Sequence, residues 1–483
     1  MKIAVIGNGI IGRNVSKYLI NNDLEVDLIS LISSDKATID NKTIIKDNLT
    51  EKIVGRSLSP KFSRKDFLIS KKISDSNLPK KNYNFIGLEL TSSMGLANFW
   101  GANIAIDENN LDIKKLNLSK DESDFLINEI PVLDVQKHYG NKLSNYPFSK
   151  DFKIFSSKLA VWENKCIPCG KCNLYCDAIY GNSFEDIRSK KFKSVEGYVE
   201  KIYQEKGSNY VKVIIKKNNK LVQLSYDYIV VACGSIGSYR LLGNSLEFNK
   251  NIFTKLKHHP FFTTLNFSAD IKYPFKNILM SNYDISIKTD QEKYYINNYP
   301  LISSIKIFLE MGQANLLKNL GLKFLKLLEK IDKILPDNPI FFNWWLKRIY
   351  VSNIYVPDKY SSSYINLKNH ICTIIGGFRS DFEKSILDKE FYKIVLKLLK
   401  KKIFMLPKVL VVNAPGSDLH YASSLSEYFN DYDGRLKEKY YYTNLKNVIV
   451  ADSSSSSKLT IQNPTFYFVA RSLKLVSFLK NKI

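Results

Sequence analysis

Apolar and polar positions at the start of the chain predict a strand, a turn, a helix and a second strand. Residues 3–6 form a short continuous apolar run of the kind that is buried in a parallel sheet. Residues 13–22 carry apolar side chains at helical spacing, and residues 26–29 form another strand-like run. This pattern predicts that the chain begins with a β-α-β unit.

Later parts of the chain repeat both kinds of pattern. Alternating or apolar runs predict strands at residues 198–202, 210–215, 226–231 and 447–452, and a closing helix at residues 466–479. Residues 261–410 have the weakest periodicity, and we interpret them as most of a second lobe. Within them, a helical apolar stripe at residues 316–331 is surrounded by lysines. Such a stripe is more often the core face of a lobe than a helix on a membrane surface.

The first turn has the spacing GxGxxG, and each glycine has a separate expected role. Gly7 allows a tight turn, Gly9 allows the backbone to approach a diphosphate, and Gly12 allows the helix to pack close to the strand. The helix N-terminus then directs N–H groups at the anion. Ser30 occupies the end of the second strand, where an acidic residue usually holds a ribose hydroxyl. Dinucleotide binding is favoured over a turn without a ligand.

Length and charge restrict the class of protein. A chain of 483 residues is larger than one ordinary core, so two lobes are expected. The net charge of +24 is spread along the chain, and no nucleic-acid-binding motif accompanies it, so we expect no nucleic-acid partner. No apolar signal segment precedes the first strand, and no apolar stretch is long enough to span a bilayer, which predicts a cytoplasmic protein.

A run of four cysteines is the densest chemical signal in the sequence. Cys166, Cys169, Cys172 and Cys176 have the spacing C-x2-C-x2-C-x3-C, which is typical of iron–sulfur ligation. A single cluster would use three of these thiolates with either Cys176 or a distant partner, Cys233 or Cys372. The alternatives are a zinc site and a metal-free turn of buried thiols.

Several separated stretches together resemble the glucose–methanol–choline family of flavin oxidoreductases. The stretches that carry this resemblance are Gly7 to Gly12, Ser93 to Trp100, Val199, Ala232-Cys233-Gly234, His259-Pro260, His420, Val450-Ala451-Asp452 and Asn463-Pro464-Thr465. They occur in the family's order and cover about half of the chain, whereas residues 270–405 match no family block. The cysteine run also resembles a cysteine-rich stretch of some bacterial members, which in certain dehydrogenases binds an iron–sulfur cluster beside the flavin.

The resemblance implies an α/β fold with an α+β second lobe. A Rossmann-like FAD-binding domain would be assembled from both chain ends and joined to a substrate or cap domain. The expected FAD-binding segments are residues 1–110, 191–260 and 411–483. Residues 111–190 would connect the lobes and hold the cysteine-rich loop, and residues 261–410 would form the substrate domain.

The resemblance also implies which residues contact FAD and substrate. The expected cofactor-binding residues are Gly7, Gly9, Gly12, Ser30, Ser93, Asn98, Val199, Asp452, Asn463, Pro464 and Thr465. His420 would take the hydroxyl proton of an alcohol while hydride passes to the flavin, and Asn463 would bind the same oxygen. Tyr421 to Ser424 replace the proline- and glycine-rich residues that usually follow this histidine.

The expected activity is therefore that of an FAD-dependent alcohol dehydrogenase acting on a sugar or glycoside hydroxyl. A [4Fe–4S] or [3Fe–4S] cluster would carry electrons to a protein or quinone acceptor other than oxygen. One alternative is a flavin and iron–sulfur reductase of a carbonyl or double bond, supplied by ferredoxin. Another is a redox sensor without enzymatic activity. Peripheral membrane contact would come from the basic helix at residues 313–335.

Overall fold

The structure is a computed structural model of the 483-residue chain. It describes residues 1–31, 80–83, 85, 87, 89, 103–104, 111–135, 151–167, 178–180, 187–217, 220–246, 253–272, 283–289, 292–301, 347–361, 363–368, 370–376, 381–412, 415–416, 418, 420–438 and 445–482. Ser93, Asn98, Cys169, Cys172, Cys176 and the basic helix predicted at residues 313–335 lie outside this description.

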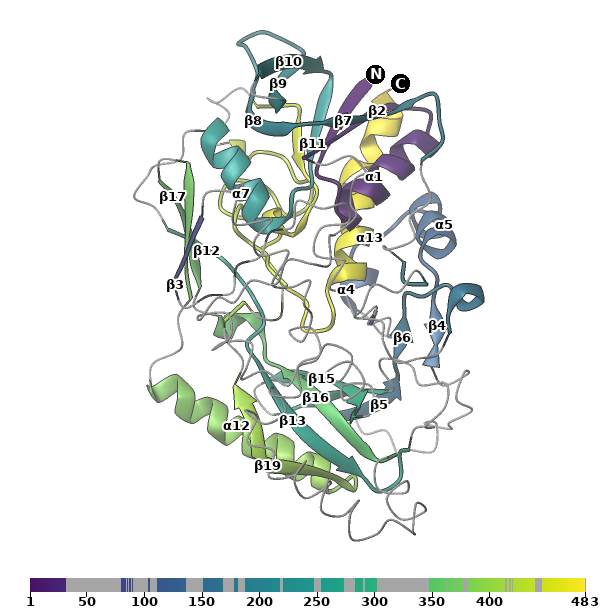
Figure 1. Ribbon diagram of the computed structural model, residues 1–483, viewed down its shortest axis with the longest axis vertical. Helices are drawn as coiled ribbons and strands as arrows, with labels where there is room; N and C mark the ends of the chain where they lie inside the picture. Colours follow the sequence, from purple (N-terminus) through teal and green to yellow (C-terminus); the bar gives the residue numbers. More distant parts are fainter. Residues whose placement is uncertain are drawn as a thin grey trace, which may run out of the picture.

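A five-stranded parallel sheet joins the two ends of the chain. Its strand order is β20-β11-β1-β2-β7, and every neighbouring pair is parallel. The strands are β1 (Lys2–Ile6), β2 (Glu25–Ser30), β7 (Phe192–Glu196), β11 (Tyr228–Val231) and β20 (Val448–Val450). The N- and C-termini consequently lie close together at one end of the molecule (Figure 1).

Helices cover both faces of this sheet because its strands are apolar on both sides. On one face, Ile3 and Val5 pack with α1 (Ile10–Asn21), α5 (Lys120–Glu129) and α13 (Thr465–Val476). On the other face, Ala4 and Ile6 share a cluster with α7 (Gly234–Ser245). Helix α5 begins with a capping box, in which Ser119 and Glu122 satisfy each other's backbone N–H groups.

Smaller sheets and short helices surround the parallel sheet. The three-stranded antiparallel sheet contains β8 (Tyr198–Tyr203), β9 (Val211–Lys217) and β10 (Lys220–Tyr226). The four-stranded sheet contains β3 (Lys80–Tyr83), β12 (Thr254–Lys255), β17 (Tyr364–Lys368) and β18 (Ile371–Ile375), and the two-stranded sheet pairs β4 (Leu133–Asp134) with β6 (Lys158–Leu159). The short helices are α4 (Leu111–Lys114), η5 (Glu163–Lys165), η6 (Asp358–Tyr360), η8 (Ser453–Ser455) and η9 (Ser477–Lys482).

A six-stranded antiparallel sheet forms the far end of the molecule (Figure 1). Its order is β19-β13-β16-β15-β14-β5, and α12 (Asp381–Leu399) packs on one face. Its strands are β5 (Phe152–Ser156), β13 (Phe261–Ser268), β14 (Tyr283–Lys288), β15 (Lys293–Pro300), β16 (Ile349–Tyr355) and β19 (Ile403–Val412). The α12 face is mainly apolar, with Asn298 and Ser352 as a buried hydrogen-bonded pair, whereas the opposite face buries Asp284 and Asn353 and also carries Tyr355.

The structure confirms a mixed α/β fold with a parallel sheet and confirms the β-α-β unit at the N-terminus. It divides the strand expected at residues 226–231. Tyr226 ends β10 in the antiparallel sheet, and Tyr228 begins β11 in the parallel sheet. The predicted segment boundaries at residues 110, 190, 260 and 410 stay a prediction. Within the described residues, no helix combines the length and apolar character required to cross a membrane.

Candidate active site

The turn between β1 and α1 is so closely packed that two of its three glycines have no room for a side chain. Gly7 has φ +112°, and a Cβ there would lie 2.4 Å from the carbonyl oxygen of Ala232. A Cβ on Gly12 would lie 1.8 Å from the carbonyl oxygen of Gly7. A Cβ on Gly9, by contrast, would meet no described atom within 4 Å. The predicted roles of Gly7 and Gly12 in the turn and the helix contact therefore have a direct steric basis, and Gly9 borders open space.

The N-terminus of α1 suits an anion. Gly9 is its N-cap and provides no side-chain hydrogen bond, and the first turn contains no acidic residue. The first amide groups of a helix have no partner within the helix, so they attract a phosphate or carboxylate group. Arg13 adds a cation in the first turn, where its Nε donates to Asn8 Oδ1 at 2.6 Å. These residues fit the diphosphate of a dinucleotide such as FAD.

Ser30 and Val199 lie on strands close to this turn. Ser30 ends β2, and its carbonyl oxygen accepts the Gly197 N–H at 2.8 Å. Val199 lies on β8, and its side chain is buried in the core cluster next to Ile29 and Ile215. The structure therefore places both predicted contact residues in the part of the fold that contains the parallel sheet.

The carboxylate of Asp452 connects the end of β20 to α7 and to the turn that follows it. Its Oδ2 accepts the Gly234 N–H at 2.9 Å and the Ser238 hydroxyl at 2.5 Å, both from α7. Its Oδ1 accepts the N–H of Ser454 at 2.9 Å and also the Ser454 hydroxyl. Burial raises the pKa of Asp452, and these hydrogen bonds oppose that increase. A cofactor contact by Asp452 would therefore come from its main chain.

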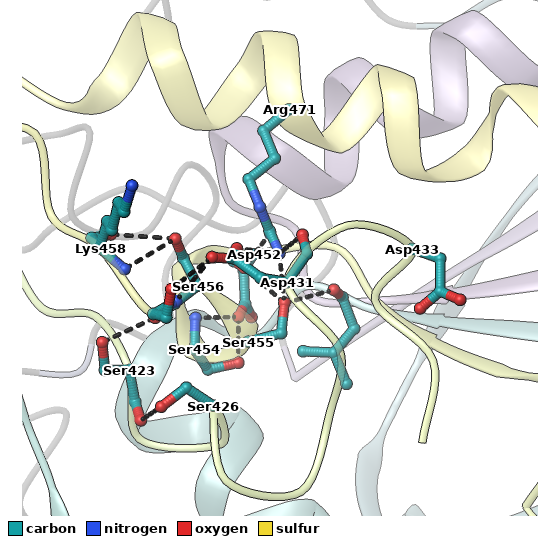
Figure 2. A network of polar contacts seen from close by, with 12 residues as sticks. Ser423, Ser426, Asp431, Asp433, Asp452, Ser454, Ser455, Ser456, Lys458 and Arg471 are labelled. Atoms are coloured by element: carbon teal, nitrogen blue, oxygen red, sulfur yellow. Dashed lines mark hydrogen bonds and ion pairs between the residues drawn. The ribbon is translucent and has the colours of Figure 1, made fainter. Parts of the chain in front are cut away.

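The turn that follows Asp452 is fixed by a buried arginine of α13 (Figure 2). Arg471 donates to the carbonyl oxygen of Asp431 at 2.7 Å, to the carbonyl oxygen of Asp452 at 3.2 Å and to Ser455 Oγ at 3.0 Å. Its guanidinium also lies 3.1 Å from Asp431 Oδ1. One side chain thus joins the closing helix, the turn after β20 and the loop around Asp431.

Three ionisable side chains from two distant segments meet at His420. His259 Nδ1 lies 3.4 Å from His420 Nδ1. Asp418 Oδ2 accepts the backbone N–H of His259 at 2.7 Å and lies 3.8 Å from His420 Nδ1. His259 and Asp418 are buried, whereas 12% of the His420 side chain is exposed. His420 is therefore the member of this histidine cluster (His259, Asp418 and His420) that is partly accessible.

A fourth ionisable group, His258, adjoins this cluster. Its Nδ1 accepts the Gly416 N–H at 3.3 Å and lies 4.0 Å from Asp418 Oδ1. Burial lowers the pKa of His258 to about 4, so this imidazole is neutral near pH 7. The negative charge of Asp418 is consequently not neutralised by His258.

Backbone hydrogen bonds hold the two histidine segments against each other. Lys257 and Ala422 exchange backbone hydrogen bonds of 3.0 Å in both directions. Tyr355 of β16 then packs on both imidazoles. Its ring centroid is 6.1 Å from that of His420, with a 29° angle between the rings, and 5.9 Å from that of His259. The polar face of the six-stranded sheet therefore reaches the histidine cluster.

Asn463 lies just before α13, and its side chain has a defined orientation. Its Oδ1 accepts the N–H of Thr465 at 3.1 Å, in an Asx turn that starts the helix. Because Oδ1 is used in this way, the Nδ2 amide group is the part of the side chain that is directed away from that N–H. Pro464, which has no N–H to lose, is the N-cap of α13.

An apolar cluster connects the glycine turn, the loop after His420 and the helix after Asn463. Ala422, Leu459 and Phe468 form its buried members, and Ile11 and Tyr467 pack against them. Ile11 belongs to the glycine turn, Ala422 lies two residues after His420, and Tyr467 lies four residues after Asn463. The structure thus brings together the three segments that were predicted to form one site.

Among the described residues, the histidine cluster is the one group with three metal-ligating side chains close together. Within the described residues, Cys166, Cys233 and Cys372 take part in no disulfide bond. The rest of the predicted cysteine ligands are outside the described residues, so the iron–sulfur site stays a prediction. Asp418 is a candidate functional residue to which the sequence analysis gave no role. The signal that could have identified it is its position two residues before His420 in a polar loop.

The comparison with known proteins gives a match by structure and none by sequence. No family model and no curated protein matches the sequence. Among solved structures, the chain is similar to pyridoxine 4-oxidase from Mesorbium loti, with a TM-score of 0.57 and 11% sequence identity. The match covers 99% of this chain and 98% of that one. At this identity the similarity shows the fold alone, and it extends over both lobes.

Proposed function

We propose that this protein is an FAD-dependent oxidoreductase of the glucose–methanol–choline type that oxidises an alcohol to a carbonyl compound. The whole-length structural match is to an enzyme of that family that is named as an oxidase. The observation that carries the proposal is the apolar cluster in which Ile11, Ala422 and Phe468 meet. This contact between the segment of the glycine turn and the segment that follows His420 supports the proposal that the two contribute to one site.

His420 is the base of the proposed reaction. When its Nδ1–H donates to His259 Nδ1, 3.4 Å away, His420 Nε2 carries the lone pair that accepts a hydroxyl proton. The resulting imidazolium is stabilised by the negative charge of Asp418, whose Oδ2 is 3.8 Å from His420 Nδ1. His259 therefore selects the tautomer, and Asp418 provides the charge.

Asn463 complements the base at the same oxygen. Its Nδ2 donates a hydrogen bond to the alkoxide that develops as the proton leaves, and an amide does not compete for that proton. FAD, when bound, accepts the hydride that leaves the carbinol carbon with its electron pair. The alcohol thus loses one hydride and one proton, and His420 Nε2 holds the proton.

Glycine-turn residues and the end of α1 would hold the cofactor. The open side of Gly9 and the uncapped amides of α1 face the expected diphosphate, and Arg13 adds positive charge there. The proposal also includes a substrate class and an electron acceptor. The sequence analysis alone supports a sugar-like hydroxyl as the substrate group, an acceptor other than oxygen and an iron–sulfur cluster that relays the electrons. Pyridoxine is an additional alcohol to test, since it names the substrate of the matched oxidase.

The direct test is reduction of the bound flavin by alcohols in the absence of oxygen. His420→Ala should retain FAD but lower the rate of flavin bleaching by about 10²- to 10⁴-fold, because the proton acceptor is missing. His370→Ala is the matched control, since His370 is exposed and lies outside the cluster. Bleaching of His420→Ala at the wild-type rate would remove His420 from this role.

The same experiment separates the alternative directions and acceptors. If ferredoxin reduces the flavin of the wild-type protein and no alcohol does so, the result would support the reductase alternative. Rapid reoxidation of alcohol-reduced protein by air would identify an oxidase, whereas reoxidation by a quinone or an acceptor protein alone would identify a dehydrogenase.

A further inference from the structure

β7 ends in an acidic residue, Glu196, whereas β2 ends in Ser30, at the position where an acidic residue usually holds a ribose hydroxyl. β2 and β7 are parallel neighbours, and their register pairs Ser30 with Glu196. Each residue is the last of its strand, and both strands point in the same direction. Glu196 therefore ends beside Ser30 at the carboxyl edge of the sheet, where this class of sheet binds ligands.

Ser30 and Glu196 also lie on the same face of the sheet. On β2, Val26 and Leu28 pack in the cluster that contains α1, and Ser30 has the same parity. On β7, Phe192 packs against that cluster, and Glu196 has the parity of Phe192. Adjacent strands are separated by about 4.8 Å, a gap that the longer side chain of a glutamate can cross.

The carboxylate of Glu196 is not engaged within the described part of the chain. Two other acids near this sheet have protein partners there. Asp27 pairs with Lys2 at 3.0 Å and accepts the Tyr226 hydroxyl at 2.9 Å, and Glu89 forms a buried ion pair with Arg240. Glu196 is half-buried, yet no hydrogen bond or ion pair joins it to a described residue. A half-buried carboxylate is stabilised by a donor, and ribose hydroxyls are donors.

The turn that would hold the cofactor lies next to this position. The Gly7 N–H donates to the carbonyl oxygen of Ile29 at 2.9 Å, so the glycine turn is joined to β2 one residue before Ser30. The Gly197 N–H donates to the carbonyl oxygen of Ser30 at 2.8 Å, which joins the end of β7 to the same place. The glycine turn that leads into α1 is thus hydrogen-bonded to the residue before Ser30, and the residue after Glu196 is hydrogen-bonded to Ser30 itself.

We propose that Glu196 binds the adenosine ribose hydroxyls of the cofactor, so that β7 supplies the carboxylate that is missing from β2. This inference rests on the proposed function, because it concerns the same dinucleotide. It deepens that function by assigning ribose recognition to a residue outside the first β-α-β unit. Ser30 is small at this position and leaves room for the glutamate of the neighbouring strand.

The test uses FAD-loaded protein and measures FAD release by the fluorescence of the free flavin. Glu196→Gln removes the charge and should raise the dissociation constant of FAD about 10-fold, as expected for charge-assisted hydrogen bonds. Glu25→Gln is the matched control, since Glu25 is exposed at the opposite end of β2. Ser30→Glu added to Glu196→Gln should restore wild-type affinity, because it returns the acid to the end of β2.

A second measurement separates ribose recognition from a structural role. ADP and 2′,3′-dideoxy-ADP are used in turn to displace FAD from the loaded protein. Wild-type protein should prefer ADP about 10-fold, and this preference should nearly vanish in Glu196→Gln. Unchanged FAD affinity and unchanged preference in Glu196→Gln would overturn the role of Glu196 and leave the proposed function standing. Wild-type protein that binds no FAD would remove both.

Discussion

The glycine turn and the histidine cluster are built in different ways. At the turn, backbone atoms decide which residues fit, since a Cβ on Gly12 would lie 1.8 Å from a carbonyl oxygen. At the cluster, side chains from two distant segments decide the geometry, and Asp418 joins them through the His259 N–H. The turn is therefore defined by residues close together in the sequence, whereas the cluster exists only after two segments that are distant in the sequence have come together.

This difference determines how a substitution should act at each place. A change at the turn should affect folding or cofactor retention. A change at the cluster should affect the rate of proton transfer and leave the cofactor bound, because the cluster side chains do not shape the turn. Two substitutions test this separation, and a third tests the buried neutral state of the neighbouring His258.

Gly12→Ala should have the largest effect, because its Cβ cannot fit between α1 and the turn. We expect a loss of about 3 kcal/mol or more in the free energy of unfolding, together with loss of bound FAD. Gly9→Ala is the matched control for stability, since its Cβ would meet no described atom within 4 Å. It should unfold like the wild type in a urea titration but bind FAD more weakly. Equal stability of Gly12→Ala and the wild type would show that the turn is not as closely packed as described.

Asp418→Asn should separate charge from shape in the histidine cluster. Asparagine keeps an oxygen for the His259 N–H but removes the charge that stabilises protonated His420. We expect flavin reduction by substrate to slow about 100-fold, equivalent to about 3 kcal/mol, with FAD content unchanged. The acidic limb of the rate profile should move to lower pH.

Asp124→Asn makes the same chemical change on the exposed surface of α5 and should leave the rate and profile as in the wild type. A normal rate in Asp418→Asn would mean that the buried charge does not assist proton transfer.

His258→Gln should reveal the smallest effect, a difference in acid sensitivity. The pKa of His258 is about 4 in the folded protein, below the usual 6.5, so the unfolded chain binds its proton first as pH falls. The contribution of neutral His258 to the free energy of unfolding is therefore complete above about pH 6.5 and is lost as pH falls towards 4. Between pH 7 and pH 5, the wild type should lose about 2 kcal/mol more than His258→Gln.

Urea titrations at the two pH values measure this difference. Glutamine is close to histidine in size and is polar but uncharged at both pH values, so it removes the titrating group and keeps a polar side chain at this position. His370→Asn, at an exposed position with φ +63°, is the control and should behave like the wild type. Identical acid sensitivity of His258→Gln and the wild type would contradict the buried neutral state of His258.

The sequence predicted the parts of the fold in which the signal is local. The glycine turn, α1 and the first two strands form one continuous stretch, and the apolar runs at β11 and β20 are short and fully buried. β7 was not predicted, because Phe192–Glu196 is short and rich in polar residues. Its pairing with β2 depends on a contact between segments that are distant in the sequence.

The strands of the six-stranded sheet could not be predicted from the pattern of apolar and polar residues, because they are buried on both faces. All seven residues of β16 are buried, and so are seven of the eight in β15. One face packs on α12, while the other buries polar side chains such as Asn297 and Asn353, so the usual alternation of buried apolar and exposed polar positions is absent. Asp418 was missed for a related reason, since its partners become neighbours only through the tertiary fold.

An absorption spectrum of the purified protein, followed by analysis of the cofactor that denaturation releases, decides whether the protein holds FAD. The proposed function predicts flavin absorption bands, FAD as the released flavin, and about one FAD for each chain. Colourless protein that also fails to quench the fluorescence of added FAD would contradict it.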